Sequence, residues 1–140
     1  MNFMLRIYLA SSWKNPYFDS VVDVLRSYGF IVYNFKDTGF SWSVIAPEWE
    51  VWTQQQFIYA LDEPVPNIAY NIDYSALHSS DICILLLPSG ASAHTEAGYM
   101  KGLGKKVYVL ALGSIRPELL YKIYDGIYTS LNALIVALIG

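Results

Sequence analysis

Residues 81–104 have the sequence DICILLLPSGASAHTEAGYMKGLG. The six apolar residues at 82–87 are typical of a strand in a parallel sheet that is covered on both faces. A turn at 88–91 follows, and a helix is predicted from about residue 92 to 103, ended by Gly104. A buried strand that leads through a tight turn into a helix is the repeating unit of α/β folds.

The segments on either side continue this alternation. Asn15 is predicted as the N-cap and Pro16 as the first residue of a helix that ends at Gly29. Further strands are predicted at 7–10, 30–35, 106–112 and 126–128, and further helices at 68–78, 117–124 and 130–140, the last capped by Ser130. The pattern predicts one domain over residues 1–140, a doubly wound five-stranded parallel sheet in the flavodoxin-like (Rossmann-like) order 2-1-3-4-5.

Composition excludes several classes of protein. The 140 residues contain 9 Lys+Arg and 12 Asp+Glu, a net charge of −3, which argues against a nucleic-acid polymer as partner. The single cysteine, Cys83, lies in the apolar strand, where burial is expected, and is compatible with a reducing, cytoplasmic location. We expect no signal peptide, and no membrane span, because the most apolar tail, 131–139, is far shorter than the roughly 20 residues a span needs.

Several familiar motifs are incomplete. The loop 10–15 lacks the glycines of a dinucleotide-binding turn, and Gly104-Lys105-Lys106 follows a helix instead of opening one. Residues 90–94 nearly match G-x-S-x-G but end in His94. His94 and Glu96 match the H-x-E of zinc deaminases, without the P-C-x-x-C that completes that site. We therefore expect neither a metal nor another cofactor.

Residues 88–99 have the pattern of an anion-binding site at the start of a helix. Small residues such as Gly90 and free backbone N–H groups at a helix N-terminus favour an anion. Ser89 and Ser92 are predicted to hydrogen-bond a phosphate, Ser11 follows the first strand at the same sheet edge, and Glu96 would face the same crevice. Alternatively, Ser92 is a helix cap and Glu96 a surface charge that complements the helix dipole.

Three sets of residues carry a resemblance to a known family. They are IYLA at 7–10, NID at 71–73 with SD at 80–81, and EAGY at 96–99 with GK at 104–105. With them the chain resembles the nucleoside 2-deoxyribosyltransferase family and its relatives, the deoxynucleoside 5′-monophosphate N-glycosidases. The resemblance covers most of the chain outside residues 36–70. It implies that Glu96 is the nucleophile, Tyr8 the tyrosine that holds it, and Asp73 the acid at the base.

Two departures from the family pattern qualify that resemblance. Several transferases carry an acidic residue before the nucleophile, whereas this loop is SGAS at 89–92, which favours a phosphate over a free 5′-hydroxyl. The transferases also lend an asparagine from a neighbouring subunit, and here Asp125 stands in the corresponding stretch as a substitute substrate contact. Without the resemblance, Tyr8 would be an ordinary strand aromatic and Asp73 an exposed helix charge.

The expected chemistry follows from these residue types. Cleavage of an N-glycosidic bond develops an oxocarbenium ion, which a carboxylate can trap while an acid assists the departing base. The expected activity is cleavage of a (deoxy)nucleoside 5′-monophosphate or nucleoside through Glu96, by hydrolysis or by transfer to another base. The alternatives are a lysine-decarboxylase-like phosphoribohydrolase, whose P-G-G-x-G-T-x-x-E motif is partly echoed at 88–96, and a non-catalytic nucleotide-binding module. The last helix is apolar on more than one face, so we also expect a homodimer or larger homo-oligomer.

Residues 36–70 form an insertion, here called the lid, which we expect to lie over the sheet. Pro47 is predicted to open a helix through about residue 61, on which Trp49 and Trp52 would share a face. The tryptophans either pack against the sheet or, because the lid leaves the second strand at the carboxyl edge, contact the substrate. We predict that Trp42 stacks on the base and that polar residues nearby (Ser41, Ser43 and residues 54–56) contact its edge.

Overall fold

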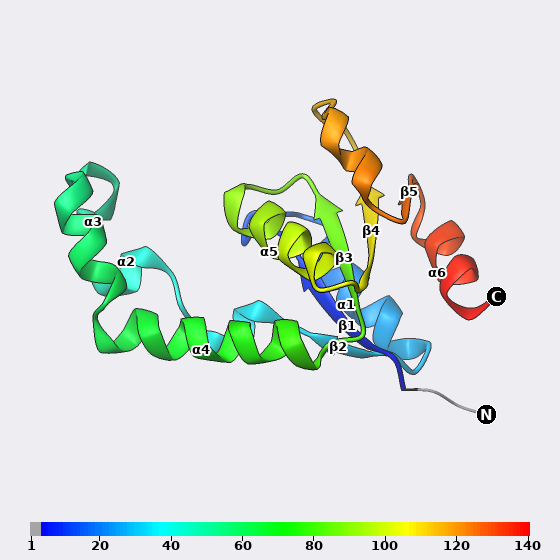
Figure 1. Cartoon of the computed structure of the whole chain (residues 1–140), viewed down its shortest axis with the longest axis horizontal. Coiled ribbons are helices and arrows are strands. Elements are labelled where there is room, and N and C mark those ends of the chain that lie inside the picture. Colours follow the sequence, from blue (N-terminus) through cyan, green and yellow to red (C-terminus); the bar gives the residue numbers. More distant parts are fainter. Residues whose placement is uncertain (1–3) are drawn as a thin grey trace.

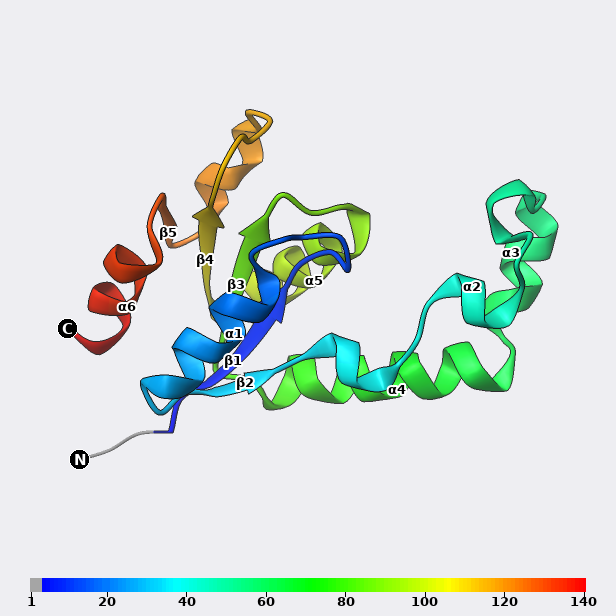
Figure 2. The ribbon, with the colours of Figure 1, turned by 180° about the vertical axis from the view of Figure 1, so that it is seen from behind.

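The computed structural model describes residues 4–140. Within this range five strands form one parallel sheet in the predicted order β2-β1-β3-β4-β5. The strands are β1 (Arg6–Ala10), β2 (Ile31–Tyr33), β3 (Ile82–Leu87), β4 (Lys106–Ala111) and β5 (Gly126–Tyr128). Helices α1 (Phe18–Ser27) and α6 (Leu131–Ile139) cover one face, and α5 (Ala91–Gly102) with the C-terminal half of α4 (Pro64–Ser79) covers the other (Figures 1 and 2).

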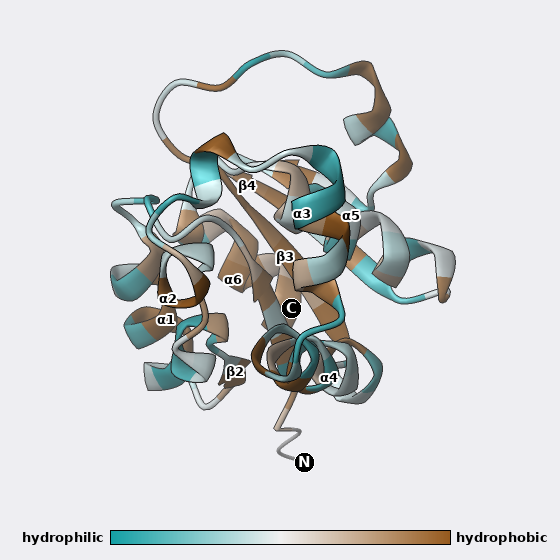
Figure 3. Cartoon of the chain, turned by 90° about the vertical axis from the view of Figure 1, so that its left-hand side faces the viewer, coloured by the Kyte–Doolittle hydropathy of each residue, from teal (hydrophilic) through white to brown (hydrophobic). Residues whose placement is uncertain are grey.

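The two faces of the sheet have separate hydrophobic cores. All six residues of β3 are buried, as its continuous apolar sequence predicts, and Figure 3 shows β3 and β4 brown along most of their length. Cys83 is fully buried, which confirms the expectation for the single cysteine. On α5 the small side chains of Ala93 and Ala97 face the sheet, so this helix lies close to the strands.

Both predicted N-cap residues accept a hydrogen bond from a backbone N–H at the start of their helix, but the first of the two helices begins later than predicted. The side chain of Asn15 accepts a hydrogen bond from the Tyr17 N–H (2.8 Å), yet regular helix begins only at Phe18. Ser130 caps α6 by accepting from the Ala133 N–H (3.1 Å), as predicted. The expected helix at 117–124 is a single 3₁₀ segment, η3 (Leu119–Ile123).

The lid differs most from its prediction. It consists of η1 (Phe35–Thr38), α2 (Trp42–Ile45), η2 (Trp49–Val51) and α3 (Gln54–Leu61), after which α4 begins at Pro64. The predicted continuous helix over 47–61 is wrong, because Trp52 and Thr53 are extended and Thr53 starts α3 with a capping box to Gln56. Trp49 and Trp52 therefore do not share a helix face.

The placement of the lid agrees with its prediction in part, because the lid lines a cavity with the β1–α1 loop and the start of α5 but does not cover a face of the sheet. Figures 1 and 2 show α2 and α3 beyond the edge of the sheet, beside the N-terminal half of α4, instead of over a sheet face. The physical reason is α4 itself, which begins four residues earlier than predicted with Pro64 at its start and is long enough to project past the sheet. No helix among residues 4–140 has the length and apolar character to cross a membrane.

Candidate active site

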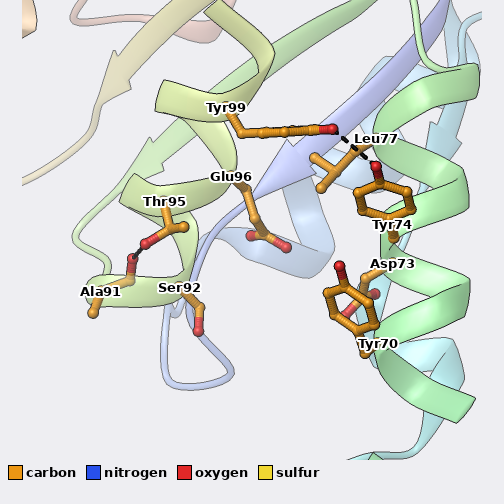
Figure 4. A pocket seen from close by; sticks show the side chains of 9 residues that line it. All are labelled: Tyr70, Asp73, Tyr74, Leu77, Ala91, Ser92, Thr95, Glu96 and Tyr99. Carbon is orange, nitrogen blue, oxygen red and sulfur yellow. Dashed lines mark hydrogen bonds between the residues drawn. The ribbon is translucent and has the colours of Figure 1, made fainter. Parts of the chain in front are cut away.

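Two cavities meet at a pair of carboxylates near the carboxyl ends of β1, β2 and β3. The first, of about 450 Å³, lies between α4 and α5. The second, of about 520 Å³, lies between the β1–α1 loop, the lid and the N-terminus of α5. Asp73 and Glu96 line both cavities, and Figure 4 shows Glu96 projecting from α5 into the space between the two helices. A ligand in either cavity would therefore meet both carboxyl groups.

Glu96 is held in place by Tyr8. The Tyr8 hydroxyl, on the fully buried side chain in β1, donates a hydrogen bond to Oε2 of Glu96. Burial raises the pKa of Glu96 to about 7, the Asp73 charge adds to the rise, and the hydrogen bond from Tyr8 opposes it. A carboxyl group whose pKa is raised this far by burial is typical of functional sites.

Asp73 faces inward because of its position on α4. Ala69 and Ala76, four residues before it and three after, are buried on the same side of the helix. Tyr33 donates a hydrogen bond to Asp73 Oδ1 at 2.6 Å. Burial raises the pKa of Asp73, and the hydrogen bond from Tyr33 opposes this rise. Asp73 is thus a half-buried group of the site and not an exposed helix charge.

Tyr33 is a site residue that the sequence analysis missed. It is the direct partner of Tyr8 in the β1–β2 register, and the two rings stack with centroids 5.2 Å apart and an interplanar angle of 26°. Burial and the nearby carboxylates raise the pKa of both tyrosines, so both stay protonated as hydrogen-bond donors. The alternation of side chains predicts which residues of a strand share a face, but the register that pairs these two is not encoded locally.

Four of the six predicted substrate contacts line the second cavity. They are Ser11, Gly90, Ser92 and Trp42. The Ser11 hydroxyl donates to the Leu86 carbonyl (2.9 Å), which holds the β1–α1 loop beside β3. Ser92 lies in the first turn of α5 and makes no capping hydrogen bond, so its interpretation as a cap is wrong. Lys14, which the sequence analysis did not assign, lines the same cavity and adds a positive charge.

The other two predicted contacts, Ser89 and Asp125, line neither cavity. The Ser89 hydroxyl is buried and has no hydrogen-bond partner within the described chain. Asp125 accepts hydrogen bonds from Lys101 Nζ (3.0 and 3.1 Å) and from the Val107 N–H (2.8 Å). In its own chain Asp125 therefore fastens the start of β5 to α5 and β4, because opposite charge draws it to Lys101.

Other residues of the quoted motifs fix the end of α4. Lys105 Nζ donates to the carbonyls of Leu77 (2.9 Å), His78 (2.6 Å) and Ser80 (2.6 Å) at the helix C-terminus. Asp81 accepts from the Arg6 N–H at 2.8 Å. These contacts fasten α4 to the sheet and so help to place Asp73 opposite Glu96.

Trp42 has two kinds of neighbour. It lines the second cavity together with Trp49, and it packs against Phe40, Trp52 and Phe57 with ring centroids 5.0 to 5.8 Å apart. The expected polar contacts at 54–56 are exposed on α3 and do not line the cavity, whereas Ser41 does. The structure thus places Trp42 where it is able to touch a ligand while it also stabilises the lid.

Metal-ligating side chains do not gather in this site. Across residues 4–140 no three His, Cys, Asp or Glu side chains come together in a group that could hold a metal ion. His94 is bound to the Gly90 carbonyl (2.8 Å) and the Tyr121 hydroxyl (2.8 Å), so it is paired elsewhere than with Glu96.

Solved structures that share this fold include two with known names. One is a 2-deoxyribosyltransferase from Bacillus psychrosaccharolyticus, with a TM-score of 0.63 and 20% identity over 92% of this chain and 89% of that chain. Another is the CMP N-glycosidase BcmB from Clostridium botulinum, with a TM-score of 0.56 and 17% identity over 95% of this chain and 97% of that chain. No family model matches the sequence, and no curated protein matches it significantly. The likeness confirms the predicted resemblance at the level of the fold.

Proposed function

We propose that this protein cleaves the N-glycosidic bond of a nucleoside 5′-monophosphate, a deoxynucleotide in preference to a ribonucleotide, with hydrolysis favoured over transfer to another base. The observation that carries the proposal is the pair of half-buried carboxyl groups, Glu96 and Asp73, each held by one tyrosine where two cavities meet. The fold that the chain shares with a deoxyribosyltransferase and an N-glycosidase supports the same chemistry.

The two carboxyl groups divide the reaction between them. The free oxygen of ionised Glu96, Oε1, forms a bond to C1′ while the C1′–N bond breaks and its electron pair stays on the base. The proton of Asp73 moves to the departing base. Water then attacks C1′, its proton returns to Asp73, and Glu96 leaves as a carboxylate. Tyr8 remains hydrogen-bonded to Oε2 and keeps the nucleophile in position.

Base release is the direct test of this function. The purified protein is incubated with a panel of deoxynucleoside and ribonucleoside 5′-monophosphates and the matching nucleosides, with and without a free acceptor base. Chromatography is expected to detect free base, and a new nucleotide if transfer occurs. If no member of the panel releases its base, the proposal that the protein is an enzyme is contradicted. Tight nucleotide binding without turnover would instead indicate a nucleotide-binding module.

A phosphate subsite is proposed at the N-terminus of α5. The first-turn N–H groups, Ser92 and Lys14 all border the second cavity and favour an anion. We predict that Lys14→Ala raises KM for the 5′-monophosphate about tenfold, in line with loss of one charge-assisted contact, and leaves KM for the nucleoside unchanged. The control is Lys122→Ala, an exposed lysine of η3 outside both cavities. If Lys14→Ala changes KM equally for the nucleotide and the nucleoside, the proposed phosphate subsite is contradicted.

Trp42 is proposed to stack on the base. Stacking on an aromatic side chain contributes about 1 to 3 kcal/mol in single-stranded nucleic-acid sites, so Trp42→Ala is expected to raise KM about tenfold or more. Trp52→Ala provides the matched control, because Trp52 packs on Trp42 without lining a cavity. Equal KM effects of both variants, with equal losses of melting temperature, would return Trp42 to a purely structural role.

The last helix supports the proposal of a homo-oligomer. Leu134 and Ile135 of α6 are buried in the core, but Val136 and Ile139 on the same helix are 65% and 63% exposed, and Ile127 of β5 is 51% exposed. An apolar face of this kind is expected to be covered by a second subunit. Light scattering at micromolar concentration should give at least twice the monomer mass of 15.8 kDa, and Val136→Glu should lower it. A monomeric wild-type protein would contradict the expectation.

A further inference from the structure

Asp73 and Glu96 are held by a matched pair of tyrosines. Tyr8 and Tyr33 are direct neighbours on β1 and β2, and the side chains of paired residues in parallel strands point to the same face of the sheet. Tyr8 donates to Oε2 of Glu96, and Tyr33 donates to Oδ1 of Asp73. The register of two strands thereby supplies one hydroxyl to each carboxyl group, and the stacked rings keep the two hydroxyls side by side.

Tyr33 makes the only hydrogen bond to the Asp73 carboxyl group within residues 4–140, and Oδ2 is left without a partner there. The carboxyl group lines both cavities, so the oxygen that Tyr33 does not hold is the one available to a ligand. A donor on Oδ1 also disfavours a proton on that same oxygen. When Asp73 is protonated, the proton consequently belongs on Oδ2.

We propose that Tyr33 is the positioning residue of the site's acid: its hydroxyl fixes the rotation of the Asp73 carboxyl group so that Oδ2 carries the proton toward the leaving base. This inference rests on the proposed function for its catalytic meaning. The contact that carries it, Tyr33 to Asp73, is open to measurement without turnover.

The charged surroundings of Asp73 define the expected pH effect. The titratable groups that face it are Tyr8 on β1, Tyr33 on β2 and Glu96 on α5, with Asp37 on η1 beyond Tyr33. Lys14 of the β1–α1 loop and Tyr99 of α5 each line one of the two cavities that Asp73 borders. Of these only Tyr33 opposes the raised pKa of Asp73, because its hydrogen bond stabilises the charged form. Replacing Tyr33 with Phe should therefore raise the pKa of Asp73 further, by about one unit for a single hydrogen bond to a charged group.

The first test measures ionisation and needs no substrate. Carboxyl-carbon NMR of protein labelled at aspartate, with the Asp73 signal assigned from Asp73→Asn, gives the titration midpoint in the wild type and in Tyr33→Phe. The control is Tyr108→Phe, a half-buried strand tyrosine that packs against the core on the other face of the sheet. The midpoint is expected to rise in Tyr33→Phe and to stay constant in the control. An unchanged midpoint in Tyr33→Phe would overturn the proposal.

The second test is kinetic. The proposed mechanism needs Glu96 ionised and Asp73 protonated, so the pH profile of kcat/KM is expected to be bell-shaped. Tyr33→Phe is expected to move that bell to higher pH and to lower kcat about tenfold with little change in KM, whereas Tyr108→Phe should do neither. A fall in melting temperature with an unmoved bell would make Tyr33 merely structural. A shifted NMR midpoint in a protein that releases no base would leave the Tyr33–Asp73 contact intact and refute the proposed function instead.

Discussion

Glu96→Gln is expected to lower kcat for base release by at least about 1,000-fold, because an amide cannot form the bond to C1′ that the proposed mechanism requires. The substitution keeps the shape of the side chain and an oxygen that can accept the Tyr8 hydrogen bond. Nucleotide binding should therefore persist, and KM or a directly measured Kd should change little. Turnover within tenfold of the wild-type rate would remove Glu96 from the role of nucleophile.

The same variant should be more stable than the wild type at alkaline pH. Burial holds the pKa of folded Glu96 at about 7, above its ordinary value of 4.5, so the folded state binds more protons than the unfolded state between these values. Stability consequently falls as pH rises from about 4.5 through about 7. Gln cannot ionise, and Glu96→Gln is expected to gain up to ~3 kcal/mol at pH 8 relative to its effect at pH 4.

Melting temperatures over this pH range measure the stability effect, with Glu48→Gln as the control at an exposed glutamate of the lid. The control should show no pH-dependent gain. A Glu96→Gln protein that is equally destabilised at pH 4 and pH 8 would contradict the raised pKa. A variant that loses turnover and gains stability would show that the buried charge of Glu96 is needed for activity and lowers the stability of the folded protein.

Asp73→Asn should lower kcat by about 100- to 10,000-fold for ordinary deoxynucleotides, because the base then departs without a proton. The loss should depend on the leaving group. A nucleotide of 7-methylguanine already carries a positive charge on its base and needs no acid, so its release should be reduced far less. KM should change little in either case, since Asp73 acts on the departing base.

The comparison of the two substrates separates acid catalysis from folding damage. A variant that loses the same factor with 7-methylguanine as with ordinary bases has lost geometry or stability and not an acid. The matched control is Asp62→Asn, an exposed aspartate at the end of α3. It should leave both substrates unaffected.

Local sequence patterns were enough to predict the elements of the sheet and one half of the site. The apolar run at 82–87 predicted a strand buried on both faces. The alternation of strand-like and helix-like segments around it predicted a doubly wound sheet in the order 2-1-3-4-5, which the structure has. The turn at 88–91 and the small residues after it placed Glu96 on the second turn of a helix at the carboxyl edge of the sheet. These features were predictable because hydrophobic period and turn chemistry act over neighbouring residues.

Which side chains meet depends on contacts between segments that are distant along the chain. Tyr33 reaches Asp73 only because β2 pairs with β1 in one register, and Lys14 borders the cavity because Ser11 and Asn15 fasten its loop to the end of β3. The lid bends at Thr53 instead of continuing as a helix, and Asp125 pairs with Lys101. Strand register, loop packing and ion pairs join residues that are distant along the chain, and their energies depend on neighbours that no local pattern records.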